Sequence, residues 1–226
     1  MTNLKSITVS LLLLIFISAF SFSQSSLSAH LGPSFPLDKF ASDNMDDNKA
    51  GSAAIGFNLG LQYLYNFEKN GLGLFIGLDF NYNGLKKDVR DSFEKDFEDM
   101  GIYNAEFKYY KYLNIPVSAG LHYTFQADKK IALLANLGLA ANFMKITDMT
   151  VKVGNITTTM KFDLATSIGF KTGAGILINK KTSITANYLY LGKHDVNATI
   201  KSNLPNEKID GEQKVDLLTL TLGFMF

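Results

Sequence analysis

Charged and amide side chains recur within several apolar segments, at positions that a strand would turn to one face. Asp79 and Asp163 supply carboxylates and Lys171 supplies an ammonium group, so an ion pair can form between them. Inside a protein, such a pair either gates a narrow pore or only neutralises charges that burial requires to be paired. Asn58 and Asn81 can add amide hydrogen bonds. We therefore predict an internal polar cluster that comprises Asn58, Asp79, Asn81, Asp163 and Lys171.

The residues that could support catalysis or hold a metal are few. Ser28 and His30 share a strand face but have no evident third partner. Ser118 and His122 lie about 13 Å apart along a strand, which is too far for a hydrogen bond. The acidic segment Asp43–Asp47 could hold Ca²⁺, but it lacks the glycine and the last glutamate of an EF-hand loop, and a solvated loop is the simpler interpretation. We predict no enzymatic activity, metal site or cofactor.

Eight segments alternate apolar and small or polar residues over a length that can cross a bilayer, about 9–11 residues. In the last one, leucines and phenylalanines alternate with Thr219, Thr221 and Gly223, and the chain ends on Phe226. In the sixth, Phe162 is assigned to the apolar face. The eight segments are Ser26–Pro36, Ile55–Tyr65, Leu72–Tyr82, Leu113–Phe125, Ile131–Phe143, Phe162–Ile176, Thr182–Leu191 and Leu217–Phe226.

This pattern predicts an all-β fold, an eight-stranded antiparallel up-and-down transmembrane β-barrel. Lipid cannot satisfy open sheet edges, so strands that cross a membrane must close into a ring. The apolar faces then point to lipid and the polar faces point to the lumen, which at eight strands is just wide enough for side chains to fill. Pro116 should lie where no hydrogen bond of the strand ladder is lost.

The connections between these segments alternate between short and long. This alternation indicates which end of the barrel faces the periplasm and which faces the exterior. Bacterial barrels have short periplasmic turns and long extracellular loops, so both termini are expected in the periplasm. Among the long connections, Asp88–Met100 has the spacing of a short amphipathic helix, with a solvated charged loop as the alternative. Met149–Lys161 resembles a hairpin that turns at Gly154 and Asn155. Leu37–Ala53 and Gly192–Gln213 are polar and read as irregular.

Composition and the first residues favour an exported protein of one domain. The chain has 226 residues, a formal charge of +1 and no cysteine, so it gives no reason to expect nucleic acid as a partner and it forms no disulfides. Lys5 precedes the apolar run Ile7–Phe20, and small residues follow at Ser21 and Ser23. This is the pattern of a signal peptide over residues 1–23, with an uncleaved anchor as the alternative. Residues 24–226 would form the barrel domain.

Three short motifs resemble the outer-membrane β-barrel domain family of Bacteroidetes, in its PorT-like form, and small barrels of the OmpX and OmpA type. Tyr112, Leu113, Ile115 and Pro116 match a segment common in that family, and the run from His30 to Phe35 is similar to its first strand. The resemblance implies an outer-membrane location in a Gram-negative bacterium. Phe226 resembles the terminal aromatic residue that the barrel-assembly machinery recognises during biogenesis.

The function expected from these features is a non-enzymatic scaffold in the outer membrane. Its surface loops would serve adhesion, envelope integrity or a partner in assembly or secretion, and its partners would include outer-membrane lipids. One alternative is a small gated pore through the polar lumen. Another is a soluble periplasmic ligand-binding barrel, in which the apolar stripe would line a central cavity.

Overall fold

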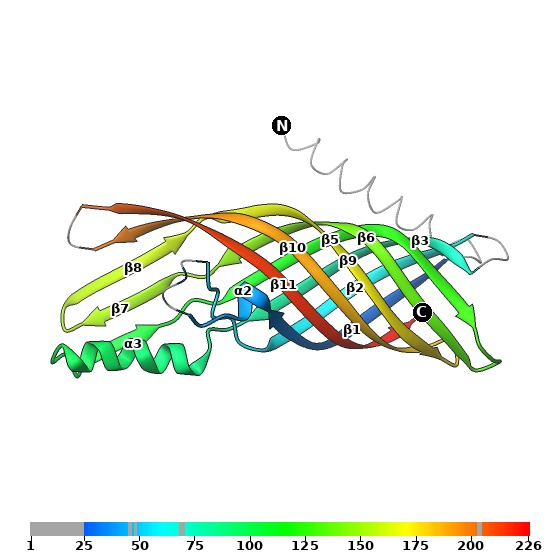
Figure 1. Cartoon of the computed structure of the whole chain (residues 1–226), viewed down its shortest axis with the longest axis horizontal. Helices are drawn as coiled ribbons and strands as arrows, with labels where there is room; N and C mark the ends of the chain where they lie inside the picture. The colour runs from blue at the N-terminus through cyan, green and yellow to red at the C-terminus, as the bar shows by residue number, and fades with distance from the viewer. Residues whose placement is uncertain (1–24, 45–46, 48, 68–70, 203–204) are drawn as a thin grey trace, which may run out of the picture.

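Eight antiparallel strands close into a barrel, as the sequence predicted. The computed structural model describes residues 25–44, 47, 49–67, 71–202 and 205–226, so the proposed signal peptide lies outside the described residues. Each strand pairs with the next around the ring, and β11 closes it by pairing with both β10 and β1 (Figure 1). The ring strands are β1 (Ser25–Leu37), β2 (Gly56–Asn66), β3 (Leu72–Asn83), β5 (Tyr112–Gln126), β6 (Ile131–Ile146), β9 (Leu164–Ile178), β10 (Thr182–Lys201) and β11 (Glu207–Met225).

The two faces of the barrel wall differ in polarity, as the alternating pattern requires. Leu59, Ile76 and Leu222 are 53%, 58% and 55% exposed, although they are large apolar residues in regular strands. Their neighbours in sequence, such as Asn58, Phe75 and Thr221, point inward and are buried. An apolar outer surface of this extent suits lipid and not water. The soluble ligand-binding alternative is therefore wrong, because the apolar stripe lines no central cavity.

The wall continues beyond the barrel at one end, which we call the extended end. There β4 (Ala105–Lys108), β7 (Met149–Val153) and β8 (Ile156–Phe162) join the upper parts of β10 and β11 in one sheet, beside helix α3 (Lys87–Asp99) (Figure 1). The predicted helix and the predicted hairpin at Gly154 are both present. The short turns lie at the opposite end, which we call the turn end, together with Ser25 and the last residues of β11.

The prediction that Gly192–Gln213 is irregular is wrong. The register of β10 and β11 shifts between Tyr190 and Lys193, and Gly192 has a positive φ of 84° at that bulge. Beyond it, pairing resumes from Lys193 opposite Lys214 to Ile200 opposite Glu207. The bulge reverses which residues face inward, so a single alternating pattern does not run through the segment. The continuation of both strands therefore cannot be predicted from alternation in the sequence.

A short segment folds back over the mouth of the barrel at the extended end. This mouth segment comprises residues 38–44, 47 and 49–53, and it begins with the single helical turn α2 (Asp38–Ala41). The Gly51 amide donates to the Lys39 carbonyl, and the Ala53 amide donates to the Phe40 carbonyl. These bonds make the segment compact, so it is more regular than the sequence suggested. It carries Phe40, which is fully buried.

Candidate functional site in the barrel interior

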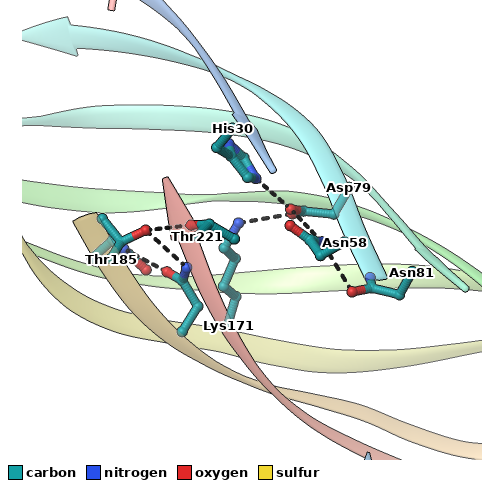
Figure 2. Close-up of polar contacts among 9 residues, drawn as sticks. His30, Asn58, Asp79, Asn81, Lys171, Thr185 and Thr221 are labelled. Atoms are coloured by element: carbon teal, nitrogen blue, oxygen red, sulfur yellow. Dashed lines mark hydrogen bonds and ion pairs between the residues drawn. The ribbon is translucent and has the colours of Figure 1, made fainter. Parts of the chain in front are cut away.

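A three-residue ionic cluster crosses the middle of the lumen. Asp79 of β3 accepts a hydrogen bond from Lys171 Nζ on β9, 2.8 Å from its Oδ2. His30 Nε2 on β1 lies 2.8 Å from Asp79 Oδ1, and the amide of Asn58 donates to that same oxygen at 3.3 Å. Figure 2 shows these side chains converging from different strands. All are buried, so the cluster pairs charges that would otherwise be costly inside the barrel.

The local sequence makes room for this cluster. A Cβ at Gly60 of β2 would lie within 2.7 Å of both His30 Nε2 and Asp79 Oδ1, so a larger residue there would push these two side chains out of their present contact. On the other side of β3, the ladder with β5 is broken between Leu78 and Asn81, directly opposite Pro116. This agrees with the expectation that Pro116 lies where a ladder bond is absent. Asp79 therefore lies between Gly60 of β2 and the interrupted ladder with β5.

Amide and hydroxyl side chains form a belt on the extended-end side of the cluster. Asn58 donates to Asn81 at 2.9 Å, and Asn142 donates to Asn114 at 2.8 Å. The belt continues across β9 and β10, because His194 Nε2 lies 2.9 Å from the Asn142 amide nitrogen and 2.8 Å from Ser167 Oγ. These residues come from six strands that follow one another around the ring, and their hydrogen bonds form two groups, one on β2 and β3 and one from β5 to β10.

Two histidines of this interior were not assigned to the predicted cluster. His30 was considered only as a base for Ser28, whereas it bonds Asp79, a residue 49 positions away in sequence. A signal existed, because His30 alternates with apolar residues just as Asp79 does. His194 was placed in a loop, and no local pattern assigned it to the lumen. Its second ring nitrogen faces the carbonyl oxygen of Gln213 at 3.3 Å and not a carboxylate, so Ser167 and His194 do not form a catalytic triad.

The prediction that Asp163 belongs to the internal cluster is wrong, and so is the outward placement of Phe162. Asp163 lies between β8 and β9, where its backbone amide bonds the Asn197 carbonyl and its side chain is exposed. The strand is interrupted there, so the alternation counted from Phe162 does not continue into Leu164. Phe162 consequently faces inward and packs against the apolar cluster described next.

An apolar cluster closes the lumen above the polar belt. Phe40 from the mouth segment packs edge-on against Tyr112 with their ring centroids 4.8 Å apart, and Val215 and Leu217 complete the contact. The Tyr112 hydroxyl donates to the Gly51 carbonyl at 2.7 Å. Tyr112 is the first residue of the family-like motif. Leu113 and Ile115 alternate with it on the outward face, and Pro116 is buried. The lumen is therefore closed at two levels, by a salt bridge and by an aromatic plug.

Ion pairs hold the mouth segment in place from the outside. Lys214 Nζ lies 2.7 Å from Asp38 Oδ2, and Lys86 Nζ lies 3.3 Å from Asp43 Oδ2. Lys39 pairs with Asp47 inside the mouth segment itself. The hydrogen bonds from these lysines lower the pKa of each of the three carboxyl groups below its ordinary value. No group of three or more potential metal ligands occurs among the described residues; Asp46 of the acidic segment lies outside them.

The remaining space in the lumen near the turn end is small. A cavity of about 40 Å³ is lined by residues that include Ser28, Gln62, His122 and Asn136. That volume holds about one to a few water molecules. This cavity is thus too small for a ligand much larger than water.

Comparison with known proteins agrees with this architecture. The family described as outer membrane protein beta-barrel domain matches residues 9–226 of the sequence. The chain belongs to this outer-membrane barrel family. Membership places the protein in the outer membrane, where the apolar outer face meets lipid. No curated protein matches the sequence significantly.

Solved structures of outer-membrane barrels share the fold. A major outer membrane protein from Thermus thermophilus is 12% identical, with a TM-score of 0.52 and coverage of 89% of this chain and 98% of that chain. OprG from Pseudomonas aeruginosa is 13% identical, with a TM-score of 0.51 and coverage of 89% and 96%. Neisserial surface protein A is 16% identical, with a TM-score of 0.44 and coverage of 90% and 96%. No described helix has the length and apolar character to span a membrane.

Proposed function

We propose that this barrel is a non-enzymatic scaffold that displays its extended end at the cell surface. Its role would be adhesion, envelope integrity or the binding of an assembly or secretion partner. The observation that carries the proposal is the double closure of the lumen by Lys171–Asp79 and by Phe40. A closed interior leaves the ordered extension as the part that can act on other molecules. The belt histidine is enclosed and lacks a carboxylate partner, which argues against an enzyme.

The orientation belongs to the same proposal. Bacterial barrels keep their short turns in the periplasm, so the turn end and both termini would lie there, with the extended end outside. Residues 1–23 would be a cleaved signal peptide, and the protein would be a PorT-like barrel of Bacteroidetes.

Phe226 is exposed, and its amide bonds the Leu27 carbonyl. Its ring would therefore be available to the barrel-assembly machinery.

Exposed apolar side chains on the extension support a role in partner binding. Met100 and Tyr103 follow α3 and are 64% and 80% exposed, in a part of the chain that lies beyond the lipid-facing strands. Ile156 and Ile209 are also exposed on the extension. Apolar side chains in water at the tip of a membrane protein favour contact with another protein. We therefore expect the partner to bind near the end of α3.

A pull-down from detergent-solubilised envelopes tests this role. The double variant Met100→Ser and Tyr103→Ser should recover several-fold less of any specific partner than the unaltered protein. Lys129→Ser, in the exposed turn between β5 and β6 at the turn end, is the control and should recover the same amount. Equal recovery by the Met100/Tyr103 variant, or a loss caused only by Lys129→Ser, would contradict surface binding.

A small gated pore is the second candidate, because the ion pair spans the lumen. The amide nitrogens of Asn81 and Asn114 are buried without a hydrogen-bond partner among the described residues, and such groups are the kind that bind internal water. Replacing Asp79 and Lys171 together by alanine should then raise the single-channel conductance in planar bilayers. The matched outer-surface pair, Lys193→Ala and Glu212→Ala, should not. Unchanged conductance in the first variant would remove this candidate.

A further inference from the structure

A second and larger cavity lies at the extended end, beyond the aromatic plug. Its volume is about 240 Å³. Its apolar walls come from the segment before β5, from the start of β5 and from β6, β8 and β10. Gly211, Glu212 and Gln213 of β11 complete the lining, and the mouth segment borders it at Ala50. The apolar and aromatic residues that line it are Tyr110, Tyr112, Ile146, Met160, Phe162 and Val196.

Aromatic rings dominate one side of this cavity. The rings of Tyr110 and Phe162 meet edge-on with centroids 5.9 Å apart, and those of Tyr110 and Tyr112 meet edge-on at 5.5 Å. Rings held in this way present both faces and edges to an occupant, and a flat aromatic molecule can pack on either. Met160 adds a thioether, which also makes favourable contacts with aromatic rings.

The charges around the opening are already matched with one another. Lys49 and Lys193 both lie 3.4 Å from Glu212 Oε1. Lys214 is shared between Asp38 and Asp216. An ionic ligand would therefore have to break a pair or bury its own charge against apolar walls, which is unfavourable. The surroundings favour an uncharged occupant.

Volume limits the size of that occupant. An apolar protein cavity of about 150 Å³ is known to take up one benzene molecule. A cavity of about 240 Å³ has room for a somewhat larger molecule. We propose that this cavity is a binding site for a small uncharged aromatic molecule of one or two fused rings. The cavity shares Tyr112 and Ile146 with the apolar cluster of the plug, whereas neither residue of the Lys171–Asp79 ion pair lines it.

Methionine methyl NMR tests the site in the intact protein in lipid nanodiscs. Indole is the probe, because it is uncharged and has two fused rings. Titration should shift the Met160 methyl resonance saturably and give cross-peaks between indole protons and that methyl group. Met225 is the internal control, because it borders the 40 Å³ cavity at the turn end, which is too small for indole. Its resonance should not show a saturable shift.

A glycine offers a way to fill the cavity without strain. Gly211 lines it, and an added Cβ would have no other atom closer than the Val196 carbonyl oxygen at 4.0 Å. Gly211→Phe should therefore weaken indole binding at least tenfold. Gly84→Phe is the matched control, because an added Cβ there also meets open space but lies away from the cavity. Binding to this control should be unchanged.

Three results would overturn the proposal. The first is the absence of a saturable Met160 shift in the unaltered protein. The second is full affinity in Gly211→Phe when the variant is folded. The third is a set of cross-peaks from Met160 to lipid acyl chains in place of indole, which would mean that the cavity takes a chain and not a ring. The first and third results are obtained with the unaltered protein. The proposal can therefore be tested even if Gly211→Phe does not fold.

Discussion

Asp79 accepts hydrogen bonds from Lys171 and His30 while it is almost fully buried, so its charge depends on partners from two other strands. Removing one partner leaves an uncompensated buried charge. Lys171→Met should therefore lower the free energy of unfolding by about 3–5 kcal/mol in lipid vesicles, measured by urea titration. Replacing both Asp79 and Lys171 by apolar residues should cost less than the single change.

The control for this residue-scale prediction is an exposed pair on the same barrel. Lys193 pairs with Glu212 in water, and such pairs contribute at most about 1 kcal/mol. Lys193→Met should therefore change the unfolding free energy little. A cost below about 1 kcal/mol for Lys171→Met as well would show that the interior is hydrated enough to solvate the unpaired carboxylate of Asp79.

A second residue-scale prediction concerns the lipid face. Leu220 and Leu78 point outward from the barrel parts of β11 and β3 and are exposed. Arginine at either position should cost about 2–4 kcal/mol, because a charge near the bilayer centre is poorly solvated. Ile209→Arg is the matched control, since Ile209 is exposed on the extension, beyond the lipid. Equal unfolding free energies for the three variants would contradict the assigned membrane depth.

At the scale of elements, exposed carboxylate–lysine pairs add to the packing of Phe40 in holding the mouth segment. The pKa values of Asp38, Asp43 and Asp47 are lowered by their lysine partners, so this contribution is complete above the ordinary value of 3.8. It is lost as the pH falls below 3.8 through the lowered pKa values. Hydrogen-exchange protection of the Gly51 and Ala53 amides should therefore be the same at pH 6 and pH 5 and should fall near pH 3.

Two comparisons make this pH prediction specific. Amides in the β3–β5 ladder should keep their protection over the same range, because their hydrogen bonds do not depend on those carboxylates. Asp38→Asn should reduce protection at Gly51 and Ala53 already at pH 6, since it removes the carboxylate by which the mouth segment binds Lys214, leaving that lysine to Asp216 alone. Constant protection down to pH 3 at both amides would mean that Phe40 packing alone retains the segment.

The sequence predicted some of these elements correctly and others wrongly. The eight strands follow from alternation over a bilayer-crossing length, and that signal is local. The predicted ranges failed where the alternation changes phase, at the bulge near Gly192 and at the break at Asp163. The pairing of Lys171 with Asp79 was one of the predicted possibilities. The contact of its third member, His30, with Asp79 depends on the registers of β1 on β2 and of β2 on β3, which no local pattern specifies.

At the scale of the whole molecule, the orientation in the membrane is the remaining prediction, and the absence of cysteine makes it simple to test. Tyr103 is exposed at the extended end, and Lys129 is exposed in the turn between β5 and β6. A membrane-impermeant maleimide added to intact cells should label Tyr103→Cys but label Lys129→Cys only after the outer membrane is opened. The reverse pattern would mean that the barrel is inserted with its extension in the periplasm. In that case Met100 and Tyr103 would face periplasmic partners, while the internal ion pair and the aromatic plug would be unaffected.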